Sequence, residues 1–234
     1  MRSLMKIHGL QKMTLLDYPG KVACTVFFGG CDLRCPFCHN SDLLDMNAPA
    51  IMEEDELLSF LEKRRGLLEG VCFTGGEPLM RPELPELCEK IKALGYPVKL
   101  DSNGFRPGKL RELIDRGLID YVAVDIKNSP ARYAETAGRE DLDLSPLYET
   151  VALLKEGRID YEFRTTVVAE FHDDASFPAI GELIRGARRY FLQKFTDRDS
   201  VLFAGLHSPS PEDMRRWADL VRPYVQEVGL RGVD

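Results

Sequence analysis

The chain has 234 residues, of which 44% are apolar and 29% charged, and it carries a net charge of −7 at pH 7. This composition is typical of an ordinary soluble globular protein and argues against a disordered or fibrous one. The acidic balance does not favour nucleic-acid binding, and the longest apolar run, residues 22–28, is far shorter than the roughly 20 residues of a membrane span. Because no secretory signal is visible at the N-terminus, we expect a cytoplasmic protein whose clustered cysteines are ligands or catalysts rather than disulfides.

Short apolar runs alternate with longer amphipathic segments along the chain. In chain order, strands are predicted over residues 21–28, 70–73, 97–100, 121–125, 161–168 and 190–194. Helices are predicted between them, near residues 53–65, 82–94, 107–116, 145–156 and 174–188. The boundaries agree with glycines that follow four of these helices and with Pro82 and Pro107, which suit first turns.

Repeats of strand and helix, about 30 residues each, predict linked βαβ units and a parallel sheet in an α/β fold. Right-handed crossovers would curl this sheet as in a TIM barrel, but six units are fewer than its eight. Periodicity alone leaves open a partial, open (β/α)6 barrel and a doubly wound sheet. Because no long linker divides the chain, we expect a single domain over residues 1–234, with a core at about 20–195. The C-terminal extension, 196–234, is predicted to contain a helix over 211–224 and a strand near 226–232.

The most informative feature of the sequence is a run of three cysteines within eight residues, GGCDLRCPFCHN, at Cys31, Cys35 and Cys38. Pro36 argues against buried cysteines on a helix, because it lacks an amide hydrogen and disfavours helical angles at the preceding residue. Three sulfurs gathered in a loop suit an iron–sulfur cluster or a soft metal ion. The spacing also leaves open structural zinc completed by His39 or Cys24, although zinc sites usually show two separated ligand pairs. Cys72 and Cys88 are expected to be small buried apolar residues.

Polar motifs also fall at the ends of the next predicted strands. In chain order they are TGGEP at 74–78, DSNG at 101–104 and DIK at 125–127. In βα-repeat folds the carboxyl ends of the strands form the edge where ligands bind. Taken singly, each motif has a plainer interpretation. The glycines could permit a tight turn, and Glu77 could be an acid in a first helical turn, favoured by the helix dipole. Asp101 and Asn103 could form an Asx-turn and an N-cap, and Asp125 could pair with Lys127.

Together these motifs resemble a known superfamily. The C-x3-C-x2-C spacing, with the aromatic Phe37 before the last cysteine, is the signature of radical S-adenosylmethionine (SAM) enzymes. The 74–78 and 101–104 motifs resemble the GGEP and D-[ST]-N-G elements of that superfamily, and 125–127 resembles the D-x-K of glycyl-radical-enzyme activases. DYPG at 17–20 and CHN at 38–40 match the same activases. The resemblance covers about residues 5–195 and implies the open, partial (β/α)6 barrel, with outer helices and a C-terminal helical cover.

The resemblance also implies what the site residues do. The three cysteines, which are the expected catalytic residues, would ligate three irons of a [4Fe–4S] cluster and leave the fourth iron for SAM. The expected SAM contacts are Phe37, Gly75, Gly76, Glu77, Ser102, Asn103, Asp125, Lys127, Arg164 and Gln193. Among them, Glu77 would meet the SAM ammonium and Lys127 its carboxylate or ribose. Asp101 and Asp125 would help to hold a monovalent cation beside SAM. The V-P-G of the activases is replaced here by residues 168–170, VAE.

Within the activases, the N-terminal motifs most resemble the activating proteins of anaerobic ribonucleoside-triphosphate reductase. The resemblance therefore implies an enzyme that cleaves SAM reductively to a 5′-deoxyadenosyl radical and generates a glycyl radical on that reductase. It would receive its electron from a one-electron donor such as flavodoxin or ferredoxin. The alternative is a radical SAM enzyme that acts on a small molecule, as 7-carboxy-7-deazaguanine synthase does. A zinc-stabilised interaction module is a third, non-enzymatic interpretation.

Overall fold

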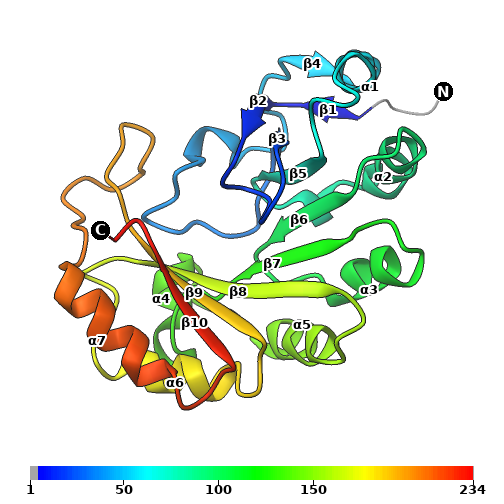
Figure 1. Cartoon of the computed structure of the whole chain (residues 1–234). Helices are drawn as coiled ribbons and strands as arrows, with labels where there is room; N and C mark the ends of the chain where they lie inside the picture. The colour runs from blue at the N-terminus through cyan, green and yellow to red at the C-terminus, as the bar shows by residue number, and fades with distance from the viewer. Residues whose placement is uncertain (1–4, 234) are drawn as a thin grey trace. The chain divides into compact units, whose positions relative to one another are not determined.

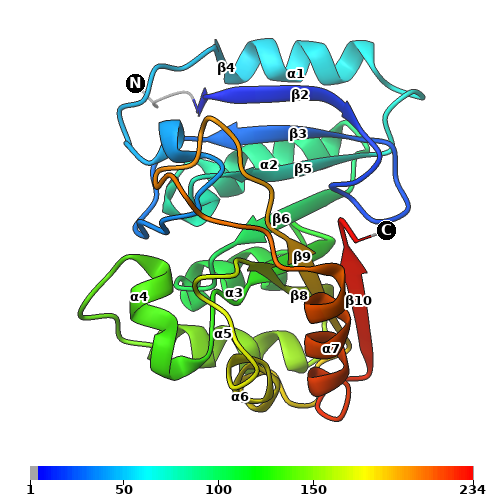
Figure 2. The same cartoon turned by 90° about the vertical axis from the view of Figure 1, so that its left-hand side faces the viewer.

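The computed structural model describes residues 5–233, and this part of the chain forms two compact units. The first unit runs up to Asp32 and also contains Asp42–Ser102 and Gly108–Val122. The second contains Leu33–Ser41, Asn103–Pro107 and the chain from Ala123 onward. Figure 1 labels the helices and strands of both units, and Figure 2 shows them from the side.

The first unit combines helices with strands of two separate sheets, one of them a two-stranded antiparallel pair near the N-terminus. Its strands are β1 (Lys6–Ile7), β2 (Gly9–Thr14), β3 (Ala23–Phe28), β4 (Met52–Glu53), β5 (Gly70–Gly75) and β6 (Val98–Ser102). Its helices are α1 (Glu54–Lys63), α2 (Leu84–Ala93) and most of α3 (Pro107–Asp115), with short 3-10 turns at Ser41–Leu43 and Pro78–Met80. The strand β3 pairs in parallel with β5, and β5 with β6, whereas β2 is antiparallel to β3. Nearly every residue of β3, β5 and β6 is buried, as expected for parallel strands covered on both faces.

The second unit continues the strand and helix alternation. Its strands are the end of β7 (Tyr121–Asp125), β8 (Asp160–Val167), β9 (Arg189–Lys194) and β10 (Glu227–Arg231). Its helices are α4 (Tyr133–Ala137), α5 (Ser145–Lys155), α6 (Ser176–Leu183) and α7 (Pro211–Val221), with a 3-10 turn at Pro130–Arg132. The strand order is β10-β9-β8-β7 here and β7-β6-β5-β3-β2 in the first unit, so the sheet is open rather than closed. The predicted α/β fold with a mostly parallel sheet is therefore confirmed.

The C-terminal extension forms both predicted elements. The helix α7 lies beside α6 and β10 (Figure 2), and the indole of Trp217 stacks on the ring of Phe177 with centroids 4.9 Å apart. The indole nitrogen donates a hydrogen bond of 2.7 Å to Asp174. Strand β10 pairs in parallel with β9, so the extension adds a strand to the sheet as well as a helical cover. Whether residues 1–234 make one domain stays a prediction.

Several predicted boundaries differ from the observed ones. Helix α2 begins at Leu84, so Pro82 lies before the helix and Pro85 occupies its first turn. Helix α6 ends at Leu183 rather than at 188, because Gly186 adopts a φ of +83°, which a helix cannot contain. The edge strand β2 was not predicted. Its residues 11–13 are all exposed, so the strand lacks the regular alternation of buried and exposed side chains that would reveal it. The short α4 was missed for lack of length.

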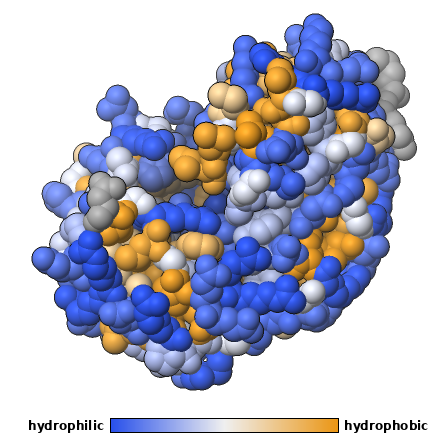
Figure 3. Space-filling view, viewed as in Figure 1, coloured by the Kyte–Doolittle hydropathy of each residue, from blue (hydrophilic) through white to orange (hydrophobic). Residues whose placement is uncertain are grey.

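No helix within residues 5–233 is both long and apolar enough to cross a bilayer. The face drawn in Figure 3 is mostly hydrophilic, with separate apolar patches. The exposed large apolar side chains include Met13 near the end of β2, Leu15 and Leu16 directly after it, and Leu202 and Phe203 in the loop after β9.

Candidate functional site

The glycines of the 74–78 motif allow two chain segments of the first unit to touch. Gly75 ends β5 with a φ of +114°, and a Cβ there would lie 2.5 Å from the backbone N and O of Phe28. A Cβ on Gly76 would lie 2.1 Å from the carbonyl oxygen of Gly30. Two backbone hydrogen bonds form where these segments meet. Gly76 N donates to Phe28 O (2.8 Å), and Glu77 N donates to Gly30 O (2.7 Å). The motif is thus packed against the residues that lead directly into Cys31, for a steric reason that holds without any ligand.

Glu77 is the buried carboxylate of this motif. Its side chain accepts a hydrogen bond from Leu79 N at 3.0 Å and thereby caps the 3-10 turn at Pro78–Met80. The hydroxyl of Ser102, at the end of β6, donates to the same carboxylate at 3.1 and 3.2 Å. Glu77 is fully buried, so it joins the carboxyl ends of two neighbouring strands through a negative charge that is removed from water.

A second charged cluster of the first unit lies on β6. The ammonium of Lys99 pairs with the carboxylate of Asp101, and the two residues share one strand face because they are two apart. The thiol of Cys72, which is opposite Lys99 in the register of β5 and β6, lies 3.8 Å from each of these groups. The cluster therefore adds Lys99, which the sequence analysis did not single out, to the predicted Asp101. A lysine two residues before Asp101 in an apolar strand was the signal that could have found it.

In the second unit, Asp125 is held by two cations. Lys127 Nζ lies 3.0 Å from Asp125 Oδ2, and Arg164 Nε lies 2.5 Å from Asp125 Oδ1. Burial alone would raise the pKa of Asp125, but Arg164 and Lys127 hold that pKa well below its ordinary range. Burial would likewise lower the pKa of Lys127, but the carboxylate of Asp125 raises it. Two cations therefore contact this one carboxylate.

The cysteines of the second unit lie in the field of that cluster. Cys35 is 8% exposed, and burial raises the pKa of its thiol to about 11, although the charge of Lys127 opposes this shift. Burial also raises the pKa of Cys38, again against the charge of Lys127. The loop is held by backbone hydrogen bonds from Cys38 N to Cys35 O (3.1 Å) and from Arg34 N to Ala137 O (2.9 Å). A positive ion or cluster that replaces the thiol protons would therefore relieve an unfavourable burial of thiolates.

The Nε2 atom of His39 is not available as a ligand in this arrangement. Its Nε2 lies 2.7 Å from the carbonyl oxygen of Thr196, and its ring stacks on Phe195 with an interplanar angle of 8°. A carbonyl only accepts hydrogen bonds, so Nε2 carries a hydrogen and has no lone pair for a metal. Cys24, the other residue considered for zinc, lies inside β3, where burial raises its pKa to about 12.

No group of three or more His, Cys, Asp or Glu side chains converges as a single metal ion requires, within the part of the chain that the structure describes. A [4Fe–4S] cube binds each cysteine through a different iron, so its ligands need not converge on one point.

The segment 195–203 contacts the cysteine loop through hydrogen bonds. Besides His39, the contacts are Ser41 Oγ to Ser200 O at 2.5 Å and Phe203 N to Pro36 O at 3.2 Å.

The remaining predicted site residues have diverse surroundings. Phe37 is buried, and its ring packs against Phe171 with centroids 5.9 Å apart. The side chain of Asn103 accepts a hydrogen bond of 3.0 Å from Phe105 N, which is the turn contact that its plainer interpretation predicts. Near the end of β9, Gln193 Oε1 is buried and has no hydrogen-bond partner among the described residues. Such an oxygen is free to accept a hydrogen bond from a ligand.

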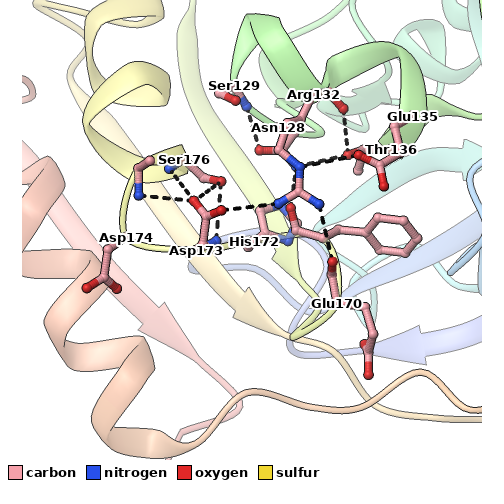
Figure 4. Close-up of polar contacts among 12 residues, drawn as sticks. Asn128, Ser129, Arg132, Glu135, Thr136, Glu170, His172, Asp173, Asp174 and Ser176 are labelled. Carbon is pink, nitrogen blue, oxygen red and sulfur yellow. Dashed lines mark hydrogen bonds and ion pairs between the residues drawn. The ribbon is translucent and has the colours of Figure 1, made fainter.

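A polar network fixes the loop that begins at Lys127 (Figure 4). His172 is buried, and its Nε2 lies 3.0 Å from the carbonyl oxygen of Lys127, while its Nδ1 lies 3.1 Å from Val168 N. Burial lowers the pKa of His172, and the two contacts fit a neutral ring that donates from Nε2 and accepts at Nδ1. Asn128 adds a hydrogen bond of 2.7 Å to Phe171 O. No local sequence pattern marked His172, because its partners come from another loop.

Comparison with known proteins adds the family. A model described as the radical SAM superfamily matches residues 25–184, which is more than half of the chain. The chain therefore belongs to the radical SAM superfamily. Membership confirms the predicted class of enzyme, and it gives this radical SAM enzyme the superfamily's cofactors, a [4Fe–4S] cluster and SAM.

This radical SAM enzyme is similar to the following two relatives and to a protein of solved structure. A protein of Methanocaldococcus jannaschii, provisionally named a glycyl-radical enzyme activating enzyme, is 28% identical over 234 residues, covering 97% of this chain and 96% of its own. The pyruvate formate-lyase-activating enzyme of Clostridium pasteurianum is 35% identical over 128 residues, covering 53% and 52%. A solved radical SAM methyltransferase from Sphaerobacter thermophilus has a TM-score of 0.67 at 18% identity, covering 95% of this chain and 70% of its own. At that identity, the methyltransferase shows a shared fold only.

The residues of the two units fit these cofactors. The first unit offers a buried carboxylate at Glu77, which suits the ammonium of SAM, and the second offers the cations of Lys127 and Arg164, which suit its carboxylate. The thiols of Cys35 and Cys38 lie in the positive field of Lys127, which favours thiolate ligands. Gln193 adds an acceptor that has no partner within residues 5–233. The chemistry of this donor set is what a thiolate-bound cluster and a zwitterionic ligand require.

Proposed function

We propose that this radical SAM enzyme is an activase, which cleaves SAM reductively and generates a glycyl radical on a partner enzyme. The observation that carries the proposal is the match along 97% of the chain to a relative that bears this activity in its name. The second relative, which activates pyruvate formate-lyase by name, supports it. The DYPG and RCPFCHN motifs favour anaerobic ribonucleoside-triphosphate reductase as the partner.

In this proposal the three cysteines of the 31–38 run ligate the cluster. When bound, the cluster supplies the electron that breaks the C5′–S bond of SAM, and the resulting 5′-deoxyadenosyl radical takes a hydrogen atom from the partner's glycine. The protein's own part is to bind, aim and exclude water. The charge of Lys127 favours the thiolate form of Cys35, and the buried ring of Phe37 offers an apolar surface to the adenine.

The charges of the two units carry the recognition of SAM. Glu77, together with backbone carbonyls at Gly75 and Gly76, receives the ammonium, and Lys127 with Arg164 receives the carboxylate. Within each unit these charges are already held by hydrogen bonds and ion pairs, which reduces the side-chain ordering that binding would require. The polar side chains that complete the SAM contacts in this proposal are Ser102, Asn103, Asp125 and Gln193. A monovalent cation at Asp101 and Asp125 stays a prediction.

A cytoplasmic location and a one-electron donor such as flavodoxin or ferredoxin belong to the same proposal. The deciding experiment mixes the anaerobically reconstituted, reduced protein with SAM and an anaerobic ribonucleoside-triphosphate reductase from the same organism. The expected result is the doublet of a glycyl radical in the EPR spectrum, together with 5′-deoxyadenosine. Cleavage of SAM without a radical on any partner, but with turnover of a pterin-like substrate, would favour the small-molecule alternative.

The ligand assignment has its own test. Cys35→Ala should remove the brown iron–sulfur absorbance and abolish SAM cleavage, because a cube held by two thiolates is not retained. Cys88→Ala, which removes a buried thiol of α2 outside the motif, is the matched control and should keep both. An intact cluster in the first variant, or a colourless wild-type protein that retains stoichiometric zinc, would contradict the proposal.

A further inference from the structure

We propose that Lys99 supplies from within the chain the positive charge that a monovalent cation would otherwise bring to Asp101, so that SAM binding needs no such cation. This inference rests on the proposed function for its SAM readout. It concerns a residue that no motif includes, and it follows from the pairing on β6.

The geometry places an ammonium directly on the carboxylate that is expected to hold a monovalent cation. The side chain of Lys99 is 1% exposed and that of Asp101 is 11% exposed, and the two form a direct ion pair. The thiol of Cys72 lies 3.8 Å from Lys99 Nζ, and the ring of Tyr121 lies below it, with the centroid 6.0 Å away. A buried lysine is unfavourable unless it is paired, so this site is built around the ion pair.

Competition with a dissolved cation follows from simple electrostatics. The ammonium of Lys99 is attached to the same strand as Asp101, so its effective concentration there exceeds that of any ion in solution. A sodium or potassium ion that joined the pair would also be repelled by Lys99 in a region of low dielectric constant. The second carboxylate expected at a cation site, Asp125, is likewise paired with Lys127 and Arg164. The residues present therefore do not fit a further cation.

The pair acts on the SAM site through its position in the chain. Asp101 precedes Ser102, whose hydroxyl donates to Glu77 at 3.1 Å. By holding Asp101, Lys99 fixes the end of β6 from which Ser102 reaches the proposed ammonium acceptor. Lys99 is thus a positioning residue, which does not itself touch SAM.

The experiment compares salts of equal ionic strength, with choline, sodium or potassium as the cation. For the reconstituted wild-type protein, the Kd of SAM should agree within about twofold in all three, because the charge at Asp101 is part of the chain. Lys99→Ala opens a space beside the carboxylate. Its affinity for SAM should be about tenfold weaker in choline and should recover as sodium, potassium or methylammonium is added to saturation.

Two matched variants show whether recovery comes from the vacated site. Lys99→Met removes the charge but fills the space, so added cations should not restore SAM binding. Lys99→Ala/Asp101→Asn removes the carboxylate that would bind the ion, and it should be equally insensitive. A purely structural role of Lys99 would not produce a saturable recovery that disappears in both controls.

A second readout needs no SAM. The thermal unfolding midpoint of full-length Lys99→Ala, measured without SAM, should rise as sodium or methylammonium replaces choline, and that of the wild type should not. A wild-type protein whose SAM affinity collapses in choline would overturn the inference, as would Lys99→Ala that is indifferent to the cation in both measurements. If Lys99→Ala does not fold, the cation independence of the wild type decides the question. If the wild type never binds SAM, the proposed function fails, while the unfolding midpoints still test Lys99.

Discussion

Each of the two units pairs a lysine with an aspartate two residues away, yet a different third group joins each pair. In the first unit, Lys99 pairs with Asp101, and the third group beside them is the thiol of Cys72, 3.8 Å from each. In the second unit, the third group is a second cation, Arg164, which joins Lys127 on the carboxylate of Asp125. A Lys–Asp pair therefore says little about the charge of a ligand. The third group, supplied by another strand or loop, decides it.

The strongest test of this comparison removes the anion of the second unit. Asp125→Asn leaves Lys127 and Arg164 without their carboxylate, and we expect a loss of about 3 kcal/mol in the free energy of unfolding, near the lower end for a broken buried pair because Asp125 is a quarter exposed. Urea unfolding of the full-length protein at pH 7 measures it. The matched control is Asp160→Asn, which breaks an exposed pair with Arg189 and should lose less than about 1 kcal/mol. Equal losses in the two variants would mean that the buried cluster has no special weight.

A smaller effect should distinguish the cationic contact to SAM from the anionic one. Lys127→Met should weaken SAM binding by about tenfold or more, because a charge-assisted contact to the SAM carboxylate is lost. The same variant should bind decarboxylated SAM about as well as the wild type does, since that analogue lacks the group that Lys127 meets. Glu77→Gln should weaken the binding of both compounds, because both carry the amine. Isothermal titration under anaerobic conditions measures these affinities, and a Lys127→Met variant that loses both compounds equally would contradict the assignment.

The smallest expected effect concerns the histidine that holds the Lys127 loop. Burial lowers the pKa of His172 below 6.5, so below about pH 6.5 the unfolded chain takes up a proton that the folded protein does not. Its contribution to stability is therefore complete above that pH and declines as the pH falls. His172→Gln keeps a donor for the Lys127 carbonyl but cannot titrate. It should reduce the slope of unfolding free energy against pH between about 5.5 and 6.5, by at most about 1.4 kcal/mol per pH unit.

Part of any such slope should survive in that variant. Burial also lowers the pKa of His8 in the first unit, and this histidine titrates in the same direction. His8→Gln is thus the companion variant. An unchanged slope after His172→Gln would show that the ring is not held neutral by its surroundings.

Local patterns in the sequence determined a large part of this protein. Apolar runs located all six predicted strands, and glycines and prolines located most helix ends, because backbone conformation and burial leave their mark on neighbouring residues. The spacing of the three cysteines, and the motifs at 74–78, 101–104 and 125–127, indicated the superfamily that the family model confirms. The edge strand β2 and the short α4 lacked such marks, and they were missed.

Only the tertiary structure decided which charged and polar groups contact one another. Periodicity shows the face on which a side chain lies, but not which distant segment packs against that face. Arg164 on Asp125, Cys72 beside Lys99, and His172 on the carbonyl of Lys127 all join residues that are at least 27 positions apart. A buried charge needs a partner, and the fold decides which distant segment supplies it. The composition of each charged cluster therefore depends on packing rather than on any local motif.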